Sequence, residues 1–177
     1  MIEEHTTTVN GLPIHYAEVT GRGPALVLLH GITGSSQTYF PLMETLARGA
    51  HVFALDLRGH GLSGHMTGAY QLPDFGQDVA NFLRLVVGGP AVIAGHSMGG
   101  LVAIWLAARE ATWVRGIHLE DPPIYITQSP RLQESVFHDM LNGLRVVLSQ
   151  HHADNGTLNG LTTVVGQWPA ADGRSMA

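Results

Sequence analysis

The chain has 177 residues, of which 45% are hydrophobic and 13% are charged, and its formal net charge is -5. This length and composition predict a globular protein with a real core, and the negative charge argues against nucleic acid or an acidic membrane surface as a partner. Because the chain contains no cysteine, a disulfide framework and a thiolate zinc site are excluded.

In chain order, short apolar runs alternate with amphipathic segments. The turn Asn10-Gly11 lies between two β-favouring runs and predicts a hairpin. The expected strands span residues 6–9, 14–19, 25–29, 51–55, 91–94 and 114–119. The expected helices run from Ser35 or Ser36 to about Arg48, from Leu72 to about Val86, and from Met98 to Glu110. Strands that alternate with helices predict an α/β fold, a mostly parallel sheet with flanking helices.

The pattern changes after Pro123. Apolar residues recur at helical spacing between Pro130 and His151, and the remainder is rich in Gly, Thr and Ala without a clear buried strand. We therefore expect two parts, an α/β core over residues 1–123 and a helical segment over residues 124–177.

The most informative motif is Gly95-His96-Ser97-Met98-Gly99, which follows a buried strand and precedes an apolar helix. In this strand–turn–helix context a serine is held on a tight turn as a nucleophile, and the two glycines relieve close backbone approaches. By itself the pentapeptide is weak evidence in a chain with 22 glycines, and a serine at this place could also be a simple helix cap. The context favours Ser97 as a catalytic nucleophile.

Acyl transfer also needs two hydrogen-bond donors aimed at the oxyanion that forms on the carbonyl oxygen. The first expected donor is the backbone N–H of Met98, directly after the nucleophile. The second comes from the glycine-rich loop that begins at His30-Gly31, and the backbone N–H of Ile32 is the best placed. A glycine-rich connection without a catalytic role is the alternative interpretation.

From about Val9 to Pro123, the chain resembles the α/β-hydrolase fold family. The resemblance rests on the buried strand into His30-Gly31, on the loop from Asp56 to Ser63, and on the Ser97 motif. It implies a serine hydrolase of the esterase, lactonase, peptidase or carbon–carbon-bond hydrolase branches, and residues 124–177 then resemble the start of the helical cap that many members insert. It also implies that His30, His60 and His96 are structural, and that Asp56 and Arg58 brace their own loop.

In this family the nucleophile is followed along the chain by an acid and then by a histidine. Asp121, at the end of the strand 114–119, is the candidate acid, although Asp before Pro also forms turns. The general-base histidine is not identified, because the closing strands that normally carry it are not visible.

Three interpretations stay open. The chain is a C-terminally truncated hydrolase, or a compact enzyme that uses Ser97, or a non-catalytic ligand-binding protein or subunit that a second chain completes. A compact enzyme would draw its acid from Asp121 or Glu120 and its base from the later histidines, His138, His151 or His152.

The expected reaction is hydrolysis of a carboxylic ester or related acyl compound through an acyl-enzyme, with a small ester-like molecule as substrate. No metal ion and no organic cofactor are implied. The unpaired edge of strand 114–119 is open to a homodimer partner or a complementing chain. The acidic amino terminus is unlike a secretory signal and no apolar run reaches membrane-spanning length, so we expect a cytoplasmic protein with no membrane partner.

Overall fold

The computed structural model describes residues 1–124, together with His138 and Asn142. The chain divides into two compact units, Met1–Pro123 and Ile124–Ala177. The expected cap falls almost wholly outside the described residues and stays a prediction. Within the described part of the chain, no helix combines the length and the apolar character that a membrane span requires.

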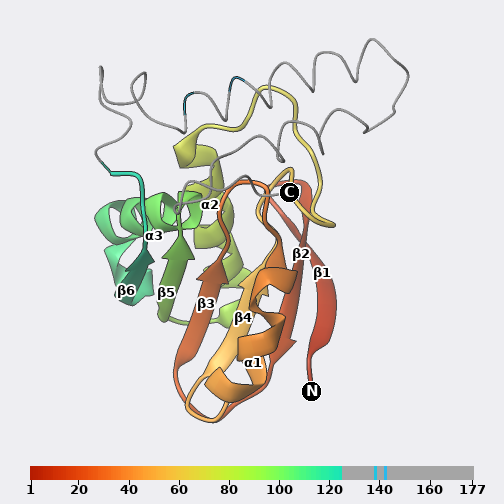
Figure 1. Ribbon diagram of the computed structural model, residues 1–177, viewed down its shortest axis with the longest axis vertical. Helices are drawn as coiled ribbons and strands as arrows, with labels where there is room; N and C mark the ends of the chain where they lie inside the picture. The colour runs from red at the N-terminus through yellow and green to blue at the C-terminus, as the bar shows by residue number, and fades with distance from the viewer. Residues whose placement is uncertain (125–137, 139–141, 143–177) are drawn as a thin grey trace, which may run out of the picture. The chain divides into compact units, whose positions relative to one another are not determined.

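The first unit is a six-stranded sheet with helices on both faces (Figure 1). Its strands are β1 (Glu3–Val9), β2 (Leu12–Val19), β3 (Ala25–Leu29), β4 (His51–Leu55), β5 (Ala91–His96) and β6 (Val114–Glu120). The spatial order is β1-β2-β4-β3-β5-β6. β3, β4, β5 and β6 run parallel, whereas β1 and β2 form an antiparallel hairpin that joins the sheet through β4. The predicted α/β class and mostly parallel sheet are confirmed.

The hairpin forms at the predicted turn. Asn10 and Gly11 have φ values of 53° and 78°, the left-handed conformation that a two-residue hairpin turn requires at both positions. The helices begin and end near the predicted residues: α1 (Phe40–Leu46) follows a 3₁₀ turn, η1 (Ser36–Tyr39), and α2 (Leu72–Phe82) continues into a π-helical turn, η2 (Leu83–Val87). α3 (Met98–Arg109) is followed by the 3₁₀ turn η3 (Ala111–Trp113).

Alternate residues of the central strands face two separate cores. Val27 and Leu29 pack with α2 and α3 in one apolar cluster, while Leu28 packs with α1 in the other. Both faces of these strands are therefore buried, as their continuous apolar sequence predicts. The arrangement places the carboxyl ends of four parallel strands at one edge of the sheet, where open α/β folds hold their ligands.

Candidate active site

Ser97 lies between β5 and α3 in a strained backbone conformation. Its φ is 51° and its ψ is -114°, which non-glycine residues adopt rarely. Such a conformation costs on the order of 1–3 kcal/mol and persists only where the surrounding structure enforces it. The predicted sharp strand–turn–helix geometry is present at this serine.

The glycines on both sides of Ser97 are required by contact with neighbouring backbone. A Cβ atom on Gly95 would lie 2.2 Å from the carbonyl oxygen of Gly99, and one on Gly99 would lie 2.1 Å from that of Leu29. Both distances are shorter than any real Cβ contact, so α3 can approach β5 and β3 this closely only with glycine at these positions.

The loop after β3 lies against the same turn. A Cβ atom on Gly31 would be 3.1 Å from the Cβ of Ser97 and 2.8 Å from Nδ1 of His96. The register Leu29↔Gly95 between β3 and β5 explains this contact, because the two strands leave the sheet side by side. The loop after β3 and the turn at Ser97, which are predicted to supply one oxyanion donor each, are therefore neighbours.

Both expected oxyanion donors lie at this junction. Met98 is the first residue of α3, and the first N–H groups of a helix have no acceptor within it. Ile32 follows Gly31 and its residue surface is 41% exposed. The backbone arrangement suits a pair of donors beside Ser97, and their role as an oxyanion hole stays a prediction.

Asp121 lies one strand away from Ser97. β5 and β6 pair in the register His96↔Glu120, and the Ser97 N–H donates a 2.9 Å hydrogen bond to the Glu120 carbonyl oxygen. Asp121 itself is exposed, has a φ of 45°, and forms no hydrogen bond or ion pair with another described residue. This position is compatible with the acid and with the turn-forming interpretation, both of which stay open.

The early histidines have structural contacts. Nδ1 of buried His30 donates to the Gly31 carbonyl oxygen at 2.7 Å, and its Nε2 accepts the Leu57 N–H at 3.0 Å. These two bonds require the neutral ring, and burial lowers the pKa of His30 further from its ordinary value. His60 bonds the Arg58 carbonyl oxygen at 2.9 Å. Both ring nitrogens of His30 are thus engaged, so this ring has no lone pair to offer Ser97 as a base.

Of the three later histidines, only His138 is described. Its ring lies 3.2–3.3 Å from the side-chain nitrogen of Asn142. His151 and His152 lie outside the described residues, so the general base stays unassigned.

The loop after β4 is held by two buried carboxylates. Asp56 accepts the N–H groups of Ser36 and Leu62 at 2.6 and 2.8 Å and contacts Nδ1 of His15 at 3.0 Å. Burial alone would raise the pKa of Asp56, but these bonds outweigh it and lower that pKa. His15 has no distinguishing pattern in the sequence, and its partner is 41 residues away, so sequence reasoning missed this pair.

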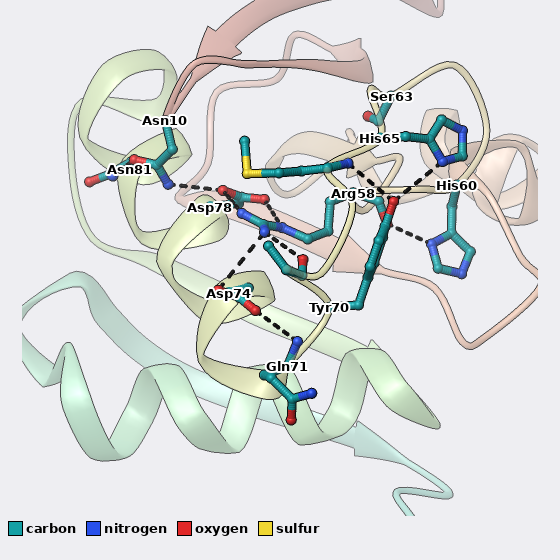
Figure 2. A network of polar contacts seen from close by, with 12 residues as sticks. Asn10, Arg58, His60, Ser63, His65, Tyr70, Gln71, Asp74, Asp78 and Asn81 are labelled. Carbon is teal, nitrogen blue, oxygen red and sulfur yellow. Dashed lines mark hydrogen bonds and ion pairs between the residues drawn. The ribbon is translucent and has the colours of Figure 1, made fainter.

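The second carboxylate is Asp78 of α2, which forms a two-pronged ion pair with Arg58 (Figure 2). The Arg58–Asp78 N–O distances are 2.6 and 2.7 Å, and both side chains are almost fully buried. Asp78 also accepts a hydrogen bond from Asn10 of the hairpin turn at 2.9 Å. The expectation that Asp56 and Arg58 brace this loop is confirmed, and Arg58 joins it to α2.

Tyr39 is a buried core residue that contacts the end of β3. Its hydroxyl donates a 2.9 Å hydrogen bond to the Leu29 carbonyl oxygen, which fixes the last residue of β3. Burial, together with the Glu120 carboxylate, raises the pKa of Tyr39 to about 12, so the phenol stays protonated as a donor. Among residues 1–124, 138 and 142, no group of three or more His, Asp or Glu side chains could hold a metal ion.

Known proteins are similar to this chain in sequence and in fold. The family model described as alpha/beta hydrolase fold matches residues 24–155. The 2-(acetamidomethylene)succinate hydrolase of Mesorhizobium japonicum is 36% identical over 106 residues, which are 60% of this chain and 38% of that protein. The pimeloyl-[acyl-carrier protein] methyl ester esterase of Xylella fastidiosa is 40% identical over 93 residues, 52% of this chain and 34% of that protein.

Among solved structures, the N-formylmaleamic acid deformylase of Pseudomonas putida S16 has a TM-score of 0.65 and 30% sequence identity. The match covers 69% of this chain and 48% of that one. The chain thus spans less than half the length of each of these three relatives. The glycine-lined turn at Ser97, the order of the sheet and the family match over residues 24–155 agree, and the chain belongs to the alpha/beta hydrolase fold family.

Proposed function

We propose that this chain supplies the serine nucleophile of a hydrolase that cleaves a carboxylic ester or a related acyl compound. The observation that supports this most strongly is the backbone of Ser97, which is strained and enclosed by Gly31, Gly95 and Gly99. A serine that served only to cap α3 would need no such conformation, because N-cap residues ordinarily have extended backbone angles. Its side chain also makes no cap hydrogen bond.

In the proposed reaction, the Ser97 Oγ attacks the carbonyl carbon of the substrate as its proton passes to a general base. The tetrahedral oxyanion accepts hydrogen bonds from the backbone N–H groups of Met98 and Ile32. Collapse of this intermediate expels the alcohol or amine and leaves an acyl-serine ester. Water then attacks the acyl-enzyme, which releases the carboxylic acid and restores Ser97.

The named relatives support an acyl compound as the substrate. One is named for an acetamidomethylene succinate, one for a methyl ester and one for an N-formyl amide. Each contains an acyl carbon bonded to oxygen or nitrogen, the bond that an activated serine cleaves. We extend to this chain only the shared class, a carboxylic ester or a related acyl compound.

The acid and base of the proposed triad need their own test. Asp121 is the candidate acid, and His138, His151 and His152 are the candidate bases that the chain contains. Each histidine is replaced singly by Ala and the turnover of p-nitrophenyl acetate is measured. A loss of turnover in one variant would support that histidine as the base, whereas unchanged turnover in all three would overturn the compact triad.

A base from outside would need a complementing polypeptide. β6 is the edge strand of the described sheet, and most of its residues are exposed, so another strand can pair with it. We propose this edge as the place where a second copy or a complementing chain joins. Addition of such a chain should then raise the turnover.

The function itself is tested by comparing wild type with Ser97→Ala. We expect turnover of p-nitrophenyl acetate to fall at least about a thousandfold in that variant. Ser35→Ala is the matched control, because Ser35 lies in the neighbouring loop and makes no cap hydrogen bond. Retained turnover in Ser97→Ala would overturn the proposal. A wild-type chain that shows no turnover but is thermally stabilised by ester analogues would favour the ligand-binding alternative.

A further inference from the structure

The side chain of His30 lies at the start of the loop that carries the expected oxyanion donor, the Ile32 N–H. His30 directly follows β3 and is only 1% exposed. Its Nδ1–H donates to the Gly31 carbonyl oxygen at 2.7 Å, and its Nε2 accepts the Leu57 N–H at 3.0 Å. The imidazole therefore joins the loop after β3 to the loop after β4, at the edge of the sheet that carries Ser97.

The bond to the Gly31 carbonyl oxygen fixes the direction of the Ile32 N–H. The Gly31 C=O and the Ile32 N–H belong to one peptide group, and in a trans peptide these two bonds point in opposite directions. A donor that holds the carbonyl oxygen on the His30 side thus turns the N–H to the other side. Among the residues that the structure describes, none accepts a hydrogen bond from the Ile32 N–H, so this N–H is available to a substrate oxygen.

The Gly31 carbonyl oxygen also closes a tight turn. It accepts the Gly34 N–H at 3.0 Å, and the φ of Thr33 is 68° whereas that of Ile32 is not positive. A positive φ at the third residue alone marks a type II turn, and it is an outlier for a β-branched residue such as threonine. Such a conformation persists only where the surrounding structure enforces it. Contacts from outside the turn must therefore hold it.

The two donors to the Gly31 carbonyl oxygen have different anchors. The Gly34 N–H belongs to the turn and moves with it, so it sets the shape of the turn but not its orientation. The His30 ring is anchored to the rest of the fold, because it is buried and its Nε2 is bonded to the Leu57 N–H. The Nδ1–H bond therefore orients the turn relative to Ser97, whose Cβ would lie 3.1 Å from a Cβ on Gly31.

Each ring nitrogen of His30 has a separate role. A carbonyl oxygen only accepts and a backbone N–H only donates, so the proton is on Nδ1 and Nε2 carries none. The Nδ1–H holds the Gly31–Ile32 peptide group, and Nε2 holds the ring itself. A substitution that keeps one contact and removes the other can thus separate the two roles.

We propose that His30 is a positioning residue that directs the Ile32 N–H toward the oxyanion, through the bond from its Nδ1–H to the Gly31 carbonyl oxygen. The imidazole does not touch the substrate, and its effect passes through one peptide group. This inference rests on the proposed function, because an oxyanion forms only if Ser97 attacks an acyl carbon.

The first test uses the free wild-type chain and needs no activity. The ¹⁵N chemical shifts of the His30 ring show which nitrogen carries the proton, and residual dipolar couplings give the direction of the Ile32 N–H bond. We expect the proton on Nδ1 and an Ile32 coupling that agrees with the structure. A proton on Nε2 would overturn the proposal, even if every variant of His30 failed to fold.

Two variants separate the roles of the ring nitrogens. His30→Asn places a side-chain N–H near the position of Nδ1, whereas His30→Gln places its amide near the position of Nε2 and loses the donor to Gly31. We expect His30→Asn to keep the wild-type direction of the Ile32 N–H and His30→Gln to change it. With p-nitrophenyl acetate, kcat should be at least about tenfold lower in His30→Gln than in His30→Asn with a similar KM, because the oxyanion forms in the transition state and not in the bound ester.

His60→Ala is the control for general damage to the loop after β4. His60 bonds the Arg58 carbonyl oxygen at 2.9 Å and its ring centroid lies 5.1 Å from that of His30 (Figure 2 shows the first contact). This variant should lower the melting temperature, while kcat and the direction of the Ile32 N–H stay close to wild type.

The outcomes distinguish this inference from the proposed function. An unchanged direction of the Ile32 N–H in His30→Gln would overturn the positioning role, as would a measurable kcat that is equal in the two His30 variants. A wild-type chain with the expected Ile32 direction, but with no turnover and no fluorophosphonate adduct, would instead count against the proposed function of Ser97.

Discussion

At the scale of single residues, the strained backbone conformation of Ser97 is held in place by contacts with neighbouring residues. Ser97 keeps its positive φ because α3 packs directly on β3 and β5 through Gly99 and Gly95. The Ser97 N–H also donates to the Glu120 carbonyl oxygen, which ties the turn to β6. Contacts on both sides of the residue therefore hold a conformation that it would not adopt in isolation.

Replacement of Gly99 by Ala should destabilise the fold strongly. Its Cβ would lie 2.1 Å from the Leu29 carbonyl oxygen, so α3 or β3 would have to shift. We expect a loss of about 3 kcal/mol in the free energy of unfolding, measured by urea denaturation. Gly116→Ala is the matched control, since a Cβ there has open space and should cost far less. Equal losses in the two variants would contradict the close-packing account.

The oxyanion role of Ile32 can be tested at its backbone. Ile32→Pro removes the N–H while Ile32→Ala keeps it, and the Ile32 residue surface is 41% exposed, so both changes perturb packing little. We expect kcat for an ester to fall by about 10²–10³ in Ile32→Pro and to change little in Ile32→Ala. Thermal melting of both variants checks that the fold is retained. A similar kcat in the two variants would exclude the Ile32 amide as a donor.

The sequence predicted the residues of this turn because local spacing encodes it. A serine flanked by glycines, between an apolar strand and an apolar helix, implies a close strand–helix crossing. The pair of His15 and Asp56 was not predictable in this way, because its two members are 41 residues apart. Sequence spacing also does not decide whether Asp121 is a catalytic acid or a turn-forming residue, because an aspartate at the end of β6 is suitable for either role.

At the scale of elements, the buried parallel strands were the most predictable part. β3 and β4 begin and end at the predicted residues, because both of their faces are apolar. The helix after β3 was less predictable: it starts as the 3₁₀ turn Ser36–Tyr39 before it becomes α1. The Ser36 N–H donates to the Asp56 carboxylate, which lies 20 residues further along the chain. This bond fixes the first turn, and it cannot be read from the local sequence around Ser36.

The loop after β4 depends on an ion pair between elements. Asp78→Asn should leave the Arg58 guanidinium buried without its counter-charge, and we expect a loss of about 3–5 kcal/mol in the free energy of unfolding. Asp74→Asn is the control, because Asp74 lies 4.0 Å from Arg58, is partly exposed, and as Asn keeps an oxygen for the Gln71 N–H. The double variant Arg58→Met/Asp78→Leu should recover most of the loss. Equal stability of Asp78→Asn and Asp74→Asn would refute the pair's importance.

At the scale of the whole molecule, sheet order explains why the candidate site forms. The crossovers place β3 and β5 side by side, so loops about 65 residues apart in sequence converge on Ser97. Alternation of strands and helices predicted this parallel order. The general base was not predictable, because no motif in this chain identifies it and the chain spans less than half of each of the three relatives.

The most direct test of the account is covalent labelling of Ser97. The chain is treated with a fluorophosphonate, its intact mass is measured, and the modified peptide is mapped. The account predicts one adduct, located on Ser97 and lost in Ser97→Ala. A wild-type chain that takes up no label, or an adduct that survives in Ser97→Ala, would contradict the assignment of Ser97 as the nucleophile.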